Sequence, residues 1–129
     1  MIEMNKKLGL PFSKMKTIFV YGTLKRGHYN YKRFGMNQSE YLGNGIVRGY
    51  KMYTNGSYPG IIKTNNEEDV ISGELFNVSE MLFNTLDMME TCAGYHIALV
   101  DINGIKDVHL FVIDGSLIKN WKLIKNGVW

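Results

Sequence analysis

The chain has 129 residues and a formal net charge of +3 at pH 7, and 45% of its residues are hydrophobic while 21% are charged. This length fits one globular domain, and the composition excludes a disordered tail. The single cysteine, Cys92, excludes an intrachain disulfide, and the three separated histidines lack the spacing of a zinc site. We therefore expect a protein without a metal or another cofactor, and we expect Cys92 to be a buried, unreactive thiol.

No apolar run approaches the roughly 20 residues that span a membrane. The N-terminal residues also lack the apolar core of a signal peptide. We expect a soluble, cytoplasmic protein that has no membrane partner.

Charge is distributed unevenly along the chain. Residues 1–33 carry eight lysines or arginines and one glutamate, whereas residues 34–118 carry four basic and eleven acidic side chains. Nucleic-acid binding favours basic residues interleaved with aromatic ones along one face, and only residues 29–33 offer part of this pattern. We interpret the lysines as solvated side chains and expect no nucleic-acid partner, so a small nucleic-acid-binding barrel is the less favoured alternative.

The first residues differ in character from the rest of the chain. They are polar and include Gly9 and Pro11 ahead of a conspicuous apolar segment. We interpret residues 1–14 as a poorly ordered N-terminal extension and residues 15–129 as a single domain.

The first strand is predicted at residues 16–21, whose sequence KTIFVY is rich in β-branched and aromatic residues. It ends before Gly22, and the pattern then indicates a loop over residues 22–30. A short helix is predicted to start within residues 31–36.

The middle of the chain has the signals of hairpins. Residues 43–53 indicate a strand with glycine interruptions, which predicts a bend or bulge. Two Asn-Gly pairs, at 55–56 and 103–104, each predict a two-residue turn in which both residues adopt positive φ. Tyr-Pro-Gly at 58–60 predicts a fixed turn.

One main helix is predicted over residues 80–91. Ser79 can cap its N-terminus, and three apolar residues fall on one face: Leu82, Leu86 and Met89. Further strands are predicted over residues 70–77, 96–102 and 105–113. Together these elements predict an α+β fold, a small mixed, mostly antiparallel β-barrel with one main helix, because closure removes exposed strand edges.

The segment VYGTLKRG at residues 20–27 is the first candidate site. A strand that stops at glycine can turn its last backbone amides toward a ligand. Gly22 and Gly27 have the spacing of a phosphate-binding loop, but His28 and Tyr29 stand where that loop requires Lys and Ser or Thr, which excludes nucleoside triphosphate binding. The spacing alone leaves open an ordinary strand-ending turn.

Glu90 is the second candidate. It lies next to Met89 and four residues after Leu86, at the edge of the apolar stripe. Partial desolvation there would raise its pKa and make it a better base. A carboxylate near a helix C-terminus opposes the helix dipole, so this position brings no structural benefit. The alternative is a solvated glutamate at a helix end.

These segments together resemble the γ-glutamylcyclotransferase-like family. VYGTLKRG is followed by Tyr-Pro-Gly at 58–60, GELF at 73–76, Leu86-Asp87 with Glu90, then Tyr95 and a final Gly-x-Trp. The resemblance extends over residues 15–129. Asn30 after the Lys-Arg-Gly segment is most similar to the γ-glutamylamine branch.

The resemblance implies an enzyme that releases 5-oxoproline from a small γ-glutamyl substrate through attack of the substrate's α-amine on its γ-carbonyl. It implies that Glu90 is the catalytic acid and base. The loop that holds the glutamyl group would consist of Tyr21, Gly22, Thr23 and Leu24. Tyr58 and Tyr95 would shape the pocket wall.

Three positions depart from the family pattern. Ile97 stands where members often carry arginine, and Phe111 and Ile113 stand where they often carry tyrosine. The lost polar groups bear on substrate preference and on activity. A non-catalytic member of the fold, binding a ligand or a protein, is therefore the main alternative to an enzyme.

Overall fold

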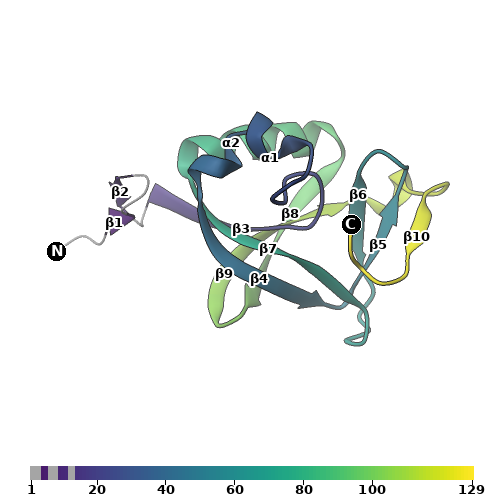
Figure 1. Ribbon diagram of the computed structural model, residues 1–129. Coiled ribbons are helices and arrows are strands. Elements are labelled where there is room, and N and C mark those ends of the chain that lie inside the picture. The colour runs from purple at the N-terminus through teal and green to yellow at the C-terminus, as the bar shows by residue number, and fades with distance from the viewer. Residues whose placement is uncertain (1–3, 6–8, 12–13) are drawn as a thin grey trace.

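The computed structural model describes residues 4–5, 9–11 and 14–129 (Figure 1). Five strands form its central sheet in the order β4-β7-β3-β9-β8. All neighbours are antiparallel except β3 and β9, which are parallel. The strands span Met15–Val20 (β3), Glu40–Arg48 (β4), Val70–Ser79 (β7), Tyr95–Ile102 (β8) and Ile105–Ile113 (β9).

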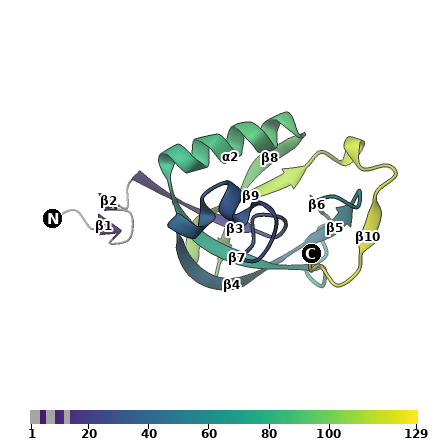
Figure 2. The same ribbon diagram turned by 45° about the horizontal axis from the view of Figure 1, so that its top comes forward.

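A second sheet lies beside the end of the first, in the order β10-β5-β6 (Figures 1 and 2). It consists of Tyr50–Thr54 (β5), Pro59–Lys63 (β6) and Lys122–Ile124 (β10), all antiparallel. Gly49, at φ 86°, separates β4 from β5. The predicted glycine interruption of residues 43–53 is therefore a real break that moves the chain from one sheet to the other.

The main helix, α2 (Glu80–Cys92), crosses one face of the central sheet (Figure 2). The Oγ atom of Ser79 accepts a hydrogen bond from the backbone N of Leu82 at 3.1 Å, as the N-cap prediction requires. Leu86 is fully buried and Phe83 is buried beside it. The short helix α1 (Asn30–Arg33) begins within the loop predicted at residues 22–30.

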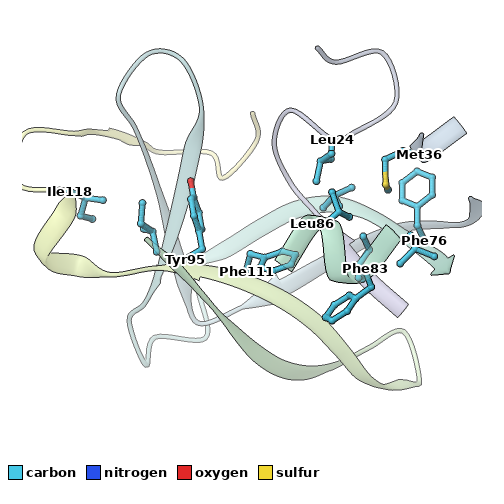
Figure 3. Packing of buried hydrophobic residues seen from close by; sticks show 12 residues of the cluster. Leu24, Met36, Phe76, Phe83, Leu86, Tyr95, Phe111 and Ile118 are labelled. Carbon is cyan, nitrogen blue, oxygen red and sulfur yellow. The ribbon is translucent and has the colours of Figure 1, made fainter. Parts of the chain in front are cut away.

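Buried residues form two clusters because side chains alternate along each strand. One cluster lies between the central sheet and α2, where Phe83 and Leu86 pack toward Phe76 and Phe111 (Figure 3). The other contains Met52 and Ile61 from the smaller sheet together with the opposite faces of the central strands. The chain thus has a core on each side of the sheet, and the first cluster continues to the end of α2.

The α+β class and the mostly antiparallel sheet are confirmed, but the sheet is not a closed barrel. Within the described residues, β4 pairs only with β7 and β8 only with β9. The two edge strands approach at one end, where the Nδ2 atom of Asn103 donates to the carbonyl oxygen of Asn44 at 3.0 Å. This side-chain hydrogen bond links the two edges without backbone pairing between β4 and β8. Closing the barrel by backbone pairing would require a matching tilt and stagger of all strands.

The two Asn-Gly hairpins differ in their turns. Asn103 and Gly104 both have positive φ, 54° and 78°, and form the predicted two-residue turn. At the other hairpin only Gly56 has positive φ, and residues 55–58 join β5 to β6. The Oδ1 atom of Asn55 accepts from the backbone N of residues 57 and 58, which holds this wider loop closed.

The predicted turn at residues 58–60 is wrong. Pro59 and Gly60 belong to β6, and Pro59 is its first residue, a position where a missing backbone donor is tolerated.

Two short strands, β1 (Met4–Asn5) and β2 (Leu10–Pro11), pair with each other and lie to one side of the sheets (Figure 1). The expectation that residues 1–14 are poorly ordered also concerns residues 1–3, 6–8 and 12–13, which lie outside the described residues. In the part of the chain that is described, no helix has the length and hydropathy needed to cross a membrane.

Candidate active site

A pocket of about 380 Å³ opens where β3 ends. Its wall comes from the loop after β3, the residues that lead into β6, the last turn of α2, and β8 and β9. It contains every residue predicted for the site: Tyr21, Gly22, Thr23, Leu24, Tyr58, Glu90 and Tyr95. These predicted residues, separated by as many as 74 positions in the chain, thus meet at one cavity.

The loop after β3 runs close to the smaller sheet. A Cβ atom on Gly22 would lie 2.7 Å from the Cγ atom of Pro59, so this approach requires glycine. The carbonyl oxygens of Gly22 and Thr23 accept from the backbone N of Lys25 and Asn30 at 3.1 and 2.8 Å. Among the described residues, the N–H groups of Thr23 and Leu24 have no partner, so the loop presents free donors where it lines the pocket.

The following residues fix this loop to the sheet. Glu74 on β7 accepts from the backbone N of Arg26 at 2.8 Å and from its Nε at 3.2 Å, and the guanidinium lies 3.7 Å from the ring centre of Tyr41. The Nζ atom of Lys25 donates to the carbonyl oxygen of Trp129 at 2.8 Å. Lys25 and Arg26 therefore anchor the loop, and neither of them lines the pocket.

Glu90 lies in the last turn of α2 with its side chain partly buried in the pocket wall. Removal from water raises the pKa of its carboxyl from 4.5 to about 7. In the described part of the chain this carboxyl has no ion pair or hydrogen bond that would offset the loss of water. Near neutral pH it therefore exchanges a proton readily, which suits a general acid and base.

Two buried tyrosines form the inner wall. The hydroxyl of Tyr95 donates to the carbonyl oxygen of Pro59 at 2.6 Å, and that of Tyr21 donates to the carbonyl oxygen of Phe111 at 2.6 Å. Burial, reinforced by the negative charge of Glu90, raises the pKa of both phenols, so they stay protonated. Their rings thus define the shape of the pocket.

Tyr58 lies at the rim and is partly exposed. Its ring packs edge-on against Trp121, with 5.6 Å between ring centres.

Several pocket residues were missed by the sequence analysis as site residues: Tyr29, Asn30, Ser57, Met89, Ala93 and Phe111. Phe111 drew attention only as a departure from the family pattern, and it does line the cavity. Ile97 and Ile113 pack against the core cluster under α2 and do not line it. Of the three departures, one therefore changes the pocket surface directly.

The expectation for Cys92 is wrong, since its thiol is exposed. Six residues along a helix from the buried Leu86 correspond to about 240° of rotation, which turns the side chain away from the core.

Residues 18–129 match the family model described as "Gamma-glutamyl cyclotransferase, AIG2-like", and the chain belongs to this family. It is 26% identical over 112 residues to the γ-glutamylcyclotransferase family protein YtfP of Escherichia coli, covering 87% of this chain and 94% of that protein. It is 34% identical over 89 residues to γ-glutamylaminecyclotransferase of Rattus norvegicus, covering 64% of this chain and 59% of the rat protein.

The solution NMR structure of the E. coli ytfP protein superposes with a TM-score of 0.70 over 88% of this chain and 95% of that one, at 26% identity. Fold and sequence thus agree on the family. Membership supports a γ-glutamylcyclotransferase-like activity on small γ-glutamyl compounds.

Proposed function

We propose that this protein releases 5-oxoproline from γ-glutamyl amines or closely related γ-glutamyl compounds, with Glu90 as general acid and base. The observation that carries the proposal is the placement of one unpaired carboxyl, with a pKa near 7, in the same pocket as a loop with free N–H groups. The name of the rat relative favours an amine as leaving group.

The reaction balances within the substrate and one carboxyl group. Glu90 takes a proton from the α-ammonium, and the freed amine attacks the γ-carbonyl carbon to close a five-membered ring. Glu90 gives this proton to the leaving nitrogen, and the bond from the carbon to that nitrogen breaks as the carbonyl re-forms. The ring nitrogen then loses its second proton through Glu90 to the released amine, so the products are 5-oxoproline and an ammonium ion. Attack within one molecule supplies an effective molarity on the order of 10⁵–10⁸ M once the substrate is folded into shape.

The loop at residues 21–24 has the chemistry to hold the negative parts of this substrate. Free N–H groups of Thr23 and Leu24 suit the α-carboxylate and the oxygen of the γ-carbonyl, which becomes an oxyanion during attack. One well-aimed donor to such an oxyanion stabilises the transition state by roughly 3–4 kcal/mol. Tyr21 and Tyr95 limit the space in which the substrate can lie, which favours the folded conformation.

The test is a screen of γ-glutamyl amines, γ-glutamyl amino acids and glutathione, with 5-oxoproline measured by chromatography. We expect turnover of compounds that have a free α-amine and a γ-linked amide. The matched control is the same compound acetylated on its α-nitrogen, which cannot attack. Release of 5-oxoproline from the acetylated compound would contradict the mechanism. Binding of 5-oxoproline by calorimetry without turnover of any compound would favour the non-catalytic alternative.

A further inference from the structure

One residue that lines the pocket has a polar atom without a partner. The Oδ1 atom of Asn30 is buried, and no group in the described part of the chain donates a hydrogen bond to it. Buried side-chain acceptors are nearly always satisfied, because an unpaired one loses its interaction with water without replacement. An exception on the wall of a cavity points to a ligand that supplies the missing donor.

The Asn30 side chain is held firmly in this orientation. Its backbone N donates to the carbonyl oxygen of Thr23 at 2.8 Å, and its Nδ2 atom donates to the Oγ1 atom of the same residue at 2.8 Å. Both residues line the pocket. One of the two N–H groups of the amide is therefore used by the loop, while the carbonyl oxygen is the buried atom that lacks a partner.

The chemistry of the proposed substrate limits which of its groups can donate a hydrogen bond to the Oδ1 atom of Asn30. Its α-carboxylate and γ-carbonyl only accept hydrogen bonds, so its donors are the α-ammonium and the γ-amide N–H. The α-ammonium has three N–H groups, of which Glu90 can take one. The α-ammonium and the α-carboxylate are attached to the same carbon atom. If the loop at residues 21–24 holds the carboxylate, the ammonium therefore lies near the Oδ1 atom of Asn30, which is fixed to that loop.

We propose that the Oδ1 atom of Asn30 accepts a hydrogen bond from the α-ammonium of the substrate, and this inference rests on the proposed function. The contact orients the amine toward the γ-carbonyl while Glu90 takes its proton. It also makes the pocket selective for compounds with an α-amine over compounds of the same length without one.

The experiment compares two ligands that differ only in the α-amine: L-γ-glutamylmethylamide and glutaric acid monomethylamide. Binding is measured by calorimetry in a Glu90→Gln background, so that the first ligand is not consumed. Asn30→Leu removes the acceptor with little change in size, and Asn30→Asp keeps an acceptor to which the Thr23 hydroxyl can donate. Melting temperatures check that both variants fold.

We expect Asn30→Leu to weaken binding of the α-amino ligand at least tenfold and to change binding of the other ligand less than twofold. We expect Asn30→Asp to bind the α-amino ligand at least as tightly as the parent, because a carboxylate attracts the ammonium. If Asn30→Leu does not fold, the test is whether Asn30→Asp binds the α-amino ligand more tightly than the ligand without the amine.

Equal weakening of both ligands by Asn30→Leu would overturn the inference and leave Asn30 as a support of the loop only. Loss of binding of both ligands in Asn30→Asp would also overturn it, since the amide would then be presenting its nitrogen. If the α-amino preference depends on Asn30 but the wild-type protein releases no 5-oxoproline, the proposed function fails while this contact stands. Binding of neither ligand to the parent would contradict both.

Discussion

The hydroxyl of Tyr95 on β8 donates to the carbonyl oxygen of Pro59 on β6 at 2.6 Å, which joins the central sheet to the smaller one. The bond lies in the wall of the pocket that contains Glu90. Because the pocket spans both sheets, its shape depends on how they are held together. The chemistry proposed for Glu90 therefore relies on a buried contact between two parts of the fold.

Glu90→Gln should lower turnover by roughly 10²–10⁴, the range expected when a positioned general base is lost. Glutamine has nearly the same size and can form hydrogen bonds, but it cannot carry the proton. The measurement is the rate of 5-oxoproline release by the variant against wild type, with circular dichroism to verify folding.

Asp87→Asn is the matched control for this variant, because Asp87 lies in the same helix, bonds to Thr91 and does not line the pocket. Its activity should stay near that of wild type. Glu74→Gln should cause a smaller loss than Glu90→Gln, because its effect passes through the anchored loop. Full activity of Glu90→Gln with loss in Glu74→Gln would assign the base to the strand instead.

Activity should depend on pH through the carboxyl of Glu90. Its pKa is about 7, and only the ionised form can accept the proton of the α-ammonium. We expect kcat/KM to rise about tenfold per pH unit well below 7 and to level off above it. A profile measured from pH 5 to 8.5 tests this, and a rate that is constant over that range would exclude a base with this pKa.

The same carboxyl should make the folded state less stable as pH rises. The folded pKa of about 7 exceeds the ordinary value of 4.5, so the folded state binds more protons between these two values. Stability is then full below about pH 4.5 and falls by up to about 3 kcal/mol as pH rises through 7.

Urea unfolding of wild type and Glu90→Gln, each at pH 4.5 and pH 8, measures this effect. Glu90→Gln lacks the titrating group, so its unfolding free energy minus that of wild type should be larger at pH 8 than at pH 4.5. The same difference at both pH values would show that Glu90 is not desolvated in the folded protein.

Sequence reasoning succeeded where local signals decide the structure. Ser79 begins α2 as predicted because capping depends on neighbouring residues, and Asn103-Gly104 forms its turn because both residues tolerate positive φ. The wider loop at Asn55 was missed because its side chain, rather than the backbone alone, closes it.

Relationships between distant residues were not readable from the sequence. Arg26 and Glu74 are 48 positions apart, and nothing near either residue indicates that one anchors the other. Barrel closure depends on the combined tilt of all strands, which no single segment encodes. The sequence motifs correctly assigned their residues to one pocket. The unpaired oxygen of Asn30, in contrast, was visible only in the structure.

Ser79→Ala should lower the unfolding free energy by about 1 kcal/mol, because the backbone N of Leu82 loses its acceptor. Chemical denaturation measures the change. Thr85→Ala is the control, since its hydroxyl is exposed in the same helix and bonds back to the carbonyl of Met81, a contact of little value to a helix. Equal losses in both variants would mean that the cap is not the cause.

A chain that begins at Met15 should fold and act nearly as the full chain does. Residue 15 starts β3, where it pairs with Ser79, and the described residues before it, β1 and β2, pair only with each other. Thermal melting and 5-oxoproline release by the shortened chain test the domain boundary proposed at residues 14 and 15. A fall of many degrees in melting temperature would show that the first 14 residues pack on the domain.

The parallel pairing of β3 with β9 brings Ile18 opposite His109, and Tyr21 bonds to Phe111 across 90 positions of sequence. During synthesis, the motif loop leaves the ribosome early and β3 can pair with β7 first, but its second partner, β9, follows only later. Folding must close a loop of that length before the contact forms, which slows the search for the native state. Until then one edge of the apolar strand β3 is unpaired and the pocket beside it is incomplete, and this interval is when chaperones would have the most to bind.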